Sequence, residues 1–202
     1  RTTNAKGQKK RSSHPDHERW ILETGGSSTL RGFLLLLTHH GAVALKPGFN
    51  HLLHPATAVA LSFGLGLIRF APGTFGAAGA FALFMPVAGA PWIWQVTLAA
   101  AAFLLGCAVC GAAARRLGEE DPSAVVWDET AGMLITLVMI PATPLAWVLG
   151  FIAFRVLDIR KPWPIARAER LPGGLGIMAD DGLAGLGAGA MVWLVFSIFT
   201  PG

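Results

Sequence analysis

Five apolar segments separated by short polar stretches dominate this chain of 202 residues, and they favour a single domain built in or against a membrane. They cover residues 56–70, 75–90, 92–114, 130–154 and 182–200. A helix that crosses a bilayer needs about 20 predominantly apolar residues, and segments 92–114 and 182–200 reach that length. Segments 56–70 and 75–90 are shorter and rich in glycine, so we expect them to tilt, to re-enter the membrane or to pack on neighbouring helices.

Charge is scarce and unevenly placed. Hydrophobic residues make up 53% of the chain and charged residues 14%, whereas soluble domains carry about 25% charge. This composition argues against a disordered protein, a coiled coil and a nucleic-acid partner. Residues 1–46 hold eight Lys and Arg against three acids, and residues 47–202 hold eight against nine. We therefore expect residues 1–46 to be a basic, disordered extension and residues 47–202 to be the functional domain.

Segment 130–154 is long enough to cross a membrane, but Pro141 and Pro144 lie at its middle. Proline removes a backbone hydrogen bond and breaks a helix, so each half is too short to cross. The pattern predicts a helical hairpin whose two ends lie on the same side. Basic residues are frequent in the flanking stretches 115–129 and 155–181. By the positive-inside rule, both stretches should meet on one cytoplasmic face.

Five acidic side chains lie directly beside apolar sequence. They are Asp128, Glu129, Asp158, Asp180 and Asp181. An ionised carboxylate next to a hydrophobic phase needs a cation or a set of hydrogen-bond donors. Successive residues on a helix diverge by about 100°, so we expect one acid of each adjacent pair to bind a metal directly.

Local helix signals suggest where these acids lie. Asp121 followed by Pro122 is typical of a helix start, which would put the first acidic pair about two turns inside that helix. In residues 71–76 (Ala-Pro-Gly-Thr-Phe-Gly), Thr74 is either a plain N-cap or part of a turn that contacts phosphate. Both interpretations of Thr74 stay open at this point.

Two basic side chains accompany the acids. Arg155, Asp158 and Lys161 follow one another at helical i, i+3 and i+6 spacing, which fits either a local ladder of ion pairs or a ligand site. Pro162 and Pro164 should end the helix and leave Lys161 at its end, where a flexible cation can reach a ligand.

A glycine-rich loop is predicted over residues 171–181, running into the final apolar helix. Glycines such as Gly174 allow backbone N–H groups to approach an anion, and the start of a helix favours one. Either Asp180 or Asp181 would be sufficient to cap that helix, so the second acid is left for another role.

Carboxylates, two cations and two glycine-containing helix starts together predict a site for a divalent cation and a phosphate. Mg²⁺ prefers carboxylate and phosphate oxygens, and a metal can activate water for attack on phosphorus. All six histidines lie at or before position 54, which excludes phosphohistidine and histidine–metal chemistry from the rest of the chain. Cys107 and Cys110 have no second pair to complete a zinc site, and we expect them to be small buried apolar side chains.

With these motifs in view, the chain from about Pro47 onwards resembles the bacterial phosphatidylglycerophosphatase A family. The motifs that carry the resemblance are residues 71–76, 126–129 (Val-Trp-Asp-Glu), Gly132, Met133, Phe154, Arg155, Asp158, 161–165 (Lys-Pro-Trp-Pro-Ile), 173–181, Ala184 and Gly185. The chain departs from the pattern at Arg69, which places a charge before the first motif. It also departs at Thr130, where a bulky apolar residue is expected.

The resemblance implies a compact, all-α, membrane-embedded domain with short or re-entrant helices and an active site on its cytoplasmic face. It further implies a multi-pass inner-membrane enzyme that uses Mg²⁺ to hydrolyse phosphatidylglycerophosphate to phosphatidylglycerol and phosphate. Under this hypothesis the metal ligands are drawn from Asp128, Glu129, Asp158, Asp180 and Asp181, and the catalytic acids and bases from Asp128, Glu129, Asp158 and Asp181. The phosphate would be bound by Arg155, Lys161, Thr74 and Gly174.

Two other functions compete with this hypothesis. A CDP-alcohol phosphotransferase also uses carboxylates and Mg²⁺, but its motif requires Ala-Arg and two further acids after the first Asp-Gly. Here Asp181-Gly182 is followed by neither the Ala-Arg nor any acid. A small transporter would use carboxylates for ion or proton coupling near the middle of its spans. Here the acids gather at segment ends beside basic residues, which favours the phosphatase.

Overall fold

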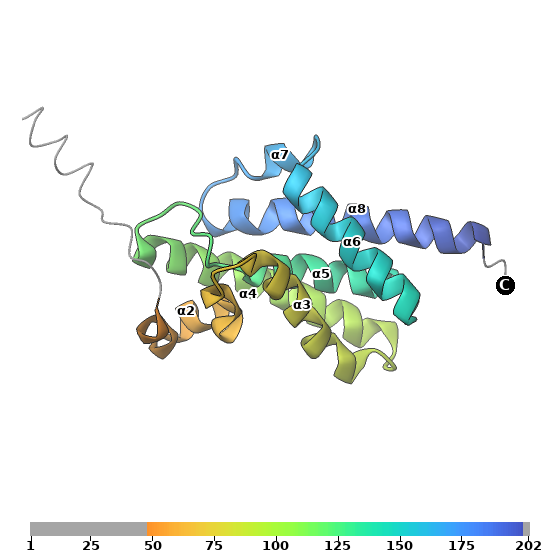
Figure 1. The fold of residues 1–202 in the computed structure, drawn as a ribbon, viewed down its shortest axis with the longest axis horizontal. Coiled ribbons are helices and arrows are strands. Elements are labelled where there is room, and N and C mark those ends of the chain that lie inside the picture. Colours follow the sequence, from red (N-terminus) through yellow and green to blue (C-terminus); the bar gives the residue numbers. More distant parts are fainter. Residues whose placement is uncertain (1–47, 200–202) are drawn as a thin grey trace, which may run out of the picture. The chain divides into compact units, whose positions relative to one another are not determined.

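The computed structural model describes residues 48–199, and all regular structure in that range is helical (Figure 1). The α-helices are α2 (Pro55–Ala60), α3 (Pro72–Phe84), α4 (Trp92–Leu117), α5 (Trp127–Met139), α6 (Pro144–Arg160), α7 (Ile165–Ala168) and α8 (Gly174–Phe199). Three 3₁₀ helices complete the set, η1 (Phe49–Leu53), η2 (Ser62–Leu67) and η3 (Met85–Val87). The all-α prediction is confirmed for these residues, while the predicted extension 1–46 lies outside them.

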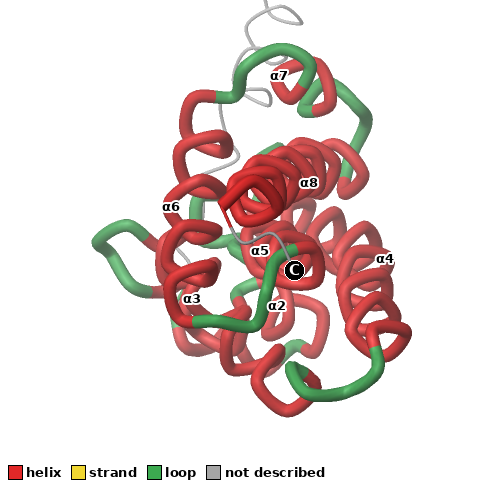
Figure 2. The backbone as a smooth tube through the Cα atoms, turned by 90° about the vertical axis from the view of Figure 1, so that its right-hand side faces the viewer, coloured by secondary structure: helices red, strands yellow, loops and turns green. Residues whose placement is uncertain are grey.

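Helix α5 forms the centre of the domain. It contacts α3, α4, α6 and α8, and Figure 2 shows it in the middle of the helices that surround it. Most of its side chains are buried, including Met133, Leu134 and Leu137. A helix that is packed on nearly every side has no solvated face for charged residues. The acids at its start therefore lie inside the protein, against other helices.

Small residues allow α5 and α8 to come very close. A Cβ atom added at Gly185 of α8 would lie 2.2 Å from the carbonyl oxygen of Gly132 in α5. A Cβ atom added at Gly132 would in turn lie 2.6 Å from the carbonyl oxygen of Asp181. Neither position has room for a side chain, so glycine sets the distance between the two helices that carry the acidic pairs.

The structure confirms that residues 130–154 form two helices with a break between them, as the hairpin prediction requires. Helix α5 ends at Met139 and α6 begins at Pro144, where the Thr143 side chain accepts a hydrogen bond of 3.3 Å from the backbone N–H of Ala146. The chain turns back between them, so the start of α5 and the end of α6 lie together.

Two predicted helix starts are wrong. Helix α5 begins at Trp127 rather than at Asp121 and Pro122, because the preceding loop is held by a tertiary contact in which the backbone N–H of Val126 donates to the carbonyl of Ala60 at 2.9 Å. The first acidic pair thus lies in the first turn of the helix, and not two turns inside it.

Helix α8 begins earlier in the chain than predicted, whereas α5 begins later. It begins at Gly174, directly after Gly173 with a positive φ of 60°, and not after residue 181. Asp180 and Asp181 therefore lie about two turns inside a continuous helix, at 1.5 Å of rise per residue. The prediction of a loop that one of these acids would cap is wrong.

Helices α4 and α8 are the two described helices long and apolar enough to cross a membrane. Each has 26 residues, and their mean hydropathies over the best window are 2.2 and 1.9. They correspond to the two long segments singled out in the sequence. Cys110 is buried in α4 as predicted, whereas Cys107 is only partly buried.

Candidate active site

Three carboxylates meet where the start of α5 approaches α8. Asp128, Glu129 and Asp181 each offer an oxygen atom, and these atoms lie within 4.8 Å of one another. Asp128 and Asp181 are 8% and 3% exposed. One oxygen of Asp128 (Oδ1) and one of Glu129 (Oε2) are buried with no hydrogen-bond partner among residues 48–199. Buried oxygens without donors are costly, so this donor set fits a divalent cation that prefers oxygen ligands.

The electrostatics of the cluster lead to the same requirement. Burial, together with the neighbouring charges of Glu129 and Asp181, raises the pKa of Asp128 well above its usual range. Burial also raises the pKa of Glu129 to about 7. The partial positive charge at the start of α5 favours the two acids there by only about 0.3–1 kcal/mol. Full ionisation of all three groups therefore requires additional positive charge.

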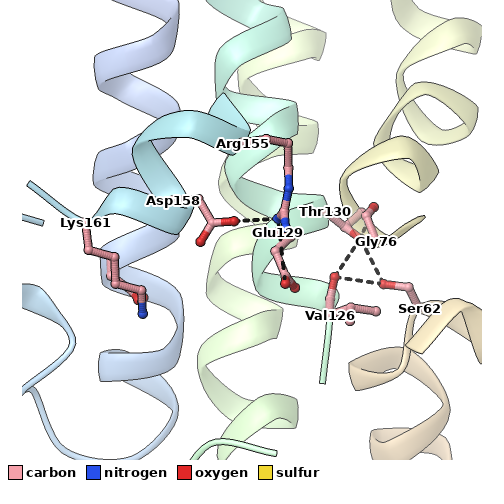
Figure 3. A network of polar contacts seen from close by, with 9 residues as sticks. Ser62, Gly76, Val126, Glu129, Thr130, Arg155, Asp158 and Lys161 are labelled. Carbon is pink, nitrogen blue, oxygen red and sulfur yellow. Dashed lines mark hydrogen bonds and ion pairs between the residues drawn. The ribbon is translucent and has the colours of Figure 1, made fainter. Parts of the chain in front are cut away.

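Arg155 of α6 lies beside Glu129 of this cluster and beside Asp158 (Figure 3). Its guanidinium forms an ion pair with Asp158, one turn further along α6, and lies 3.9 Å from Oε1 of Glu129. The Nε atom of Arg155 is buried, and no group in the described part of the chain accepts a hydrogen bond from it. The first turn of α3 closes over the pair, because a Cβ atom added at Gly73 would lie 2.1 Å from Oε1 of Glu129. Arg155 thus keeps an unused donor inside the site.

Lys161 occupies the end of α6, as predicted. It adopts a left-handed conformation with φ of 40° just after Arg160, the last residue of the helix. Its Nζ atom lies 2.7 Å from Oδ2 of Asp180 and 3.0 Å from Oε1 of Glu169. Although burial opposes the charged form, hydrogen bonds to both acids raise the pKa of Lys161 above its usual value. Lys161 is therefore a charged group fixed by two carboxylates, and sequence reasoning did not identify Glu169.

The acidic pairs behave differently from one another. Asp181 joins the cluster and Asp180 binds Lys161, as expected if adjacent residues on a helix diverge. Asp128 and Glu129 both join the cluster, against that expectation. Of the five predicted ligands, three come together, while Asp158 and Asp180 each pair with a basic side chain.

The remaining predicted phosphate contacts have other local roles. Thr74 is half-buried in the first turn of α3 and is not its N-cap, because that position is taken by Ala71 with φ of 49°. Gly174 packs on α4, where an added Cβ atom would lie 2.0 Å from the carbonyl oxygen of Cys107. This contact explains a glycine at position 174, and binding of phosphate by Thr74 or Gly174 stays a prediction.

The two charged stretches meet, as predicted, around a polar pocket of about 770 Å³. Arg115, Glu119 and Asp121 line it from one stretch, and Glu169 and Asp180 from the other. This pocket opens beside the Lys161 end of the site.

Comparison with known proteins identifies the family. A family model described as phosphatidylglycerophosphatase A matches residues 58–196. The chain belongs to the phosphatidylglycerophosphatase A family. The matched span contains every acid and cation of the candidate site, and the match confirms the resemblance based on the motifs. No solved structure matches the chain significantly.

Curated relatives agree with this family. A protein from Escherichia coli named phosphatidylglycerophosphatase A is 35% identical over 144 residues, which cover 70% of this chain and 84% of the relative. A protein of the same name from Haemophilus influenzae is 41% identical over 152 residues, covering 73% and 90%. A third relative, from Bacteroides thetaiotaomicron, is 36% identical over 136 residues, which cover 63% of this chain and 85% of the relative. It is named "Putative phosphatidylinositol-3-phosphatase".

The structure explains the departure from the family pattern at Thr130. Its hydroxyl donates to the carbonyl of Gly76 at 2.8 Å and lies 2.8 Å from the hydroxyl of Ser62 (Figure 3). The Ser62 hydroxyl oxygen also lies 3.3 Å from the carbonyl oxygen of Val126. These contacts fasten α3 and η2 to the turn of α5 that carries the acids. The sequence signal for this network was Thr130, a polar residue where the family pattern has an apolar one. The sequence alone did not indicate that Gly76 and Ser62 are its hydrogen-bond partners.

Proposed function

We propose that this protein hydrolyses phosphatidylglycerophosphate to phosphatidylglycerol and inorganic phosphate in phospholipid synthesis. The observation that carries the proposal is the buried cluster of Asp128, Glu129 and Asp181, with carboxylate oxygens that no donor satisfies. Family membership supports it, because the E. coli and H. influenzae relatives bear the name of this activity. The cluster lies beside basic side chains, as a site for an anionic phosphate requires.

Mg²⁺ is the proposed cofactor, with Asp128, Glu129 and Asp181 as its ligands. When bound, it would neutralise charge that develops on the phosphoryl group and favour ionisation of the attacking water. Asp158 and Asp180 are assigned a different role from the one predicted: they hold Arg155 and Lys161 in place. Support for this division comes from the ion pairs that each of these two acids forms.

In the proposed reaction, water attacks phosphorus and the bond between phosphorus and the glycerol oxygen breaks. A carboxylate among Asp128, Glu129, Asp158 and Asp181 accepts the proton of the water, and the leaving oxygen gains a proton to become the hydroxyl of phosphatidylglycerol. Arg155 binds a phosphoryl oxygen through its unused Nε–H donor and stabilises the charge of the transition state. Lys161 contributes positive charge from the other side.

We place this enzyme in the bacterial inner membrane with its site on the cytoplasmic face. Helices α4 and α8 would cross the bilayer, whereas α5 and α6 would enter and return on one side. The length and hydropathy of α4 and α8 support this arrangement, as do Arg115 and Arg116 at the end of α4 nearest the site. Trp92 and Trp94 at the other end of α4 suit the opposite membrane interface.

Phosphate release tests the proposal directly. Purified protein in detergent micelles is given phosphatidylglycerophosphate with Mg²⁺ and, in parallel, with excess EDTA. We expect release only with the metal, and a loss of at least about a hundredfold for Asp128→Asn, beyond the 10–100-fold typical of changes around a metal ligand. Phosphatidylinositol-3-phosphate is the comparison substrate, because one relative carries that name. Absence of release under any divalent metal would contradict the proposal and favour a transporter.

A further inference from the structure

A long apolar groove lies beside the candidate site, between α4, α5 and α8. Its volume is about 730 Å³, within the range of about 300–1,000 Å³ that is usual for ligand sites. Every described residue that lines it is apolar or glycine. None of the acids or cations of the candidate site takes part in this lining.

Each wall of the groove is one face of a helix. On α4 the wall consists of Val96, Ala99, Ala100, Phe103 and Leu104, at the i, i+3, i+4, i+7 and i+8 spacing of a single helical face. Ala100 and Leu104 are exposed in it. This face continues over two turns of α4, so the groove runs along the helix.

The opposite wall brings the groove to the carboxylate cluster. On α8 it includes Gly182 and Leu183, and Gly182 directly follows Asp181 of the cluster. On α5 it includes Ile135, which is two turns beyond Asp128 and on nearly the same face, since seven residues make almost two full turns. One end of the groove therefore begins beside the acids on both helices.

The groove also adjoins the polar pocket, because Leu171 lines both. A charged pocket, lined in part by Asp180, and a purely apolar groove are thus neighbours. An occupant that matches both must carry charge at one end and hydrocarbon at the other. In addition, the two walls on α4 and α8 belong to the helices suited to a membrane.

The geometry points to this groove as the binding site for an acyl chain of the lipid substrate, held while the phosphate lies at the carboxylate cluster. This inference rests on the proposed function and adds to it the part of the protein that recognises the lipid tail. An acyl chain in a membrane is already surrounded by hydrocarbon, so a groove lined only by apolar groups contributes through close packing against the chain. Recognition of the tail should therefore depend on chain length and on the free volume of the groove.

A substitution that fills the groove tests this role. Ala100→Trp places a large side chain in it from an exposed position, and Ala101→Trp is the matched control on an exposed position of the same helix outside the lining. We expect Ala100→Trp to lower kcat/KM for long-chain phosphatidylglycerophosphate about tenfold, the size of effect seen when an apolar pocket is changed. Its activity on the dihexanoyl substrate, which is too short to fill the groove, should stay within twofold of wild type, and Ala101→Trp should match wild type on both.

A second measurement uses the unaltered protein. Phosphatidylglycerophosphate with a photoreactive diazirine at the end of one acyl chain should label peptides of α4 and α8 that line the groove. Excess unlabelled long-chain substrate should prevent the labelling. Labelling confined to other parts of the protein overturns the inference.

The outcomes of the kinetic test are distinct. If Ala100→Trp is unchanged on the long-chain substrate, or loses both substrates equally, the groove does not select the acyl chain. If it instead shifts the protein from a dimer to a monomer without a change in long-chain kinetics, a second copy occupies the groove and the inference is wrong. If wild type releases no phosphate from either substrate, it is the proposed function that fails.

Discussion

At the scale of single residues, the hydroxyl of Thr130 connects three segments of the chain. Thr130→Val keeps the shape but removes the donor to Gly76 and leaves the buried Ser62 hydroxyl with one partner fewer. We expect a loss of about 0.5–1.5 kcal/mol of stability, the net contribution of a typical hydrogen bond. Thermal unfolding in detergent, followed by circular dichroism, measures it. Thr130→Ser retains the hydroxyl and should lose less; equal midpoints for Thr130→Val and wild type would contradict this account.

A second prediction separates the two adjacent acids of α8. Asp181→Asn removes a proposed ligand, so it should raise the Mg²⁺ concentration needed for half-maximal activity and lower activity about 10–100-fold or more. Asp180→Asn weakens the support of Lys161, so it should raise KM for the lipid while the Mg²⁺ requirement stays as in wild type. Metal titrations of phosphate release distinguish the two variants. The same shift in Mg²⁺ requirement for both would show that Asp180 is also a ligand.

The sequence identified the five acidic residues and Lys161 as site residues, but not which of the acids lie in the cluster and which pair with a basic side chain. Asp128, Glu129 and Asp181 could be named because charge is scarce beside so much apolar sequence. Whether Asp180 faces a metal or Lys161 depends on where the end of α6 lies against α8. That placement results from tertiary packing, and no local pattern in the sequence encodes it. For the same reason, the sequence did not indicate the contact between Glu169 and Lys161, because Glu169 lies outside every motif.

At the scale of helices, the contact between Gly132 and Gly185 fixes the distance between the acidic pairs. Gly185→Ala introduces a Cβ atom 2.2 Å from the carbonyl oxygen of Gly132, and backbone cannot give way as a flexible side chain can. We expect α8 to shift, Asp181 to leave the cluster and activity to fall at least about tenfold, with a lower unfolding midpoint. Phosphate release and thermal unfolding together measure the change.

Gly187→Ala is the matched control on the same helix. Its added Cβ atom meets only the end of the Leu157 side chain, at 3.0 Å, and alanine favours a helix over glycine by about 1 kcal/mol. Activity close to that of wild type is expected here. If both variants retain activity, close packing of α5 on α8 is not what holds the site together.

Helix existence was easier to predict than helix boundaries. The proline break between α5 and α6 is a local effect, and the sequence located it correctly. The starts of α5 and α8 were wrong because other interactions outweigh the local signals. The loop before α5 is held by the contact between Val126 and Ala60, and the start of α8 is set by the packing of Gly174 on α4. Both contacts join residues far apart in the chain.

At the scale of the whole domain, the described residues separate into a polar end and an apolar body. The carboxylate cluster, Lys161 and the polar pocket lie where α4 ends and α8 begins, and the apolar groove extends from there along both helices. Sequence composition predicted the gathering of charge at one end. It could not predict the groove, because a groove is a gap between side chains that depends on how three helices pack.

This separation predicts the orientation of α4 in the membrane. The loop after α4 contains the exposed Glu120 and adjoins the site, whereas Gly89 is exposed in the turn before α4. With Cys107 and Cys110 replaced by alanine, a membrane-impermeant maleimide should label Glu120→Cys in inverted vesicles and Gly89→Cys in spheroplasts, because basic residues at the end of α4 keep that end in the cytoplasm. Labelling of both cysteines from the same side would show that α4 does not cross. Labelling in the reverse pattern would put the carboxylate cluster on the outer face and would contradict the proposed orientation.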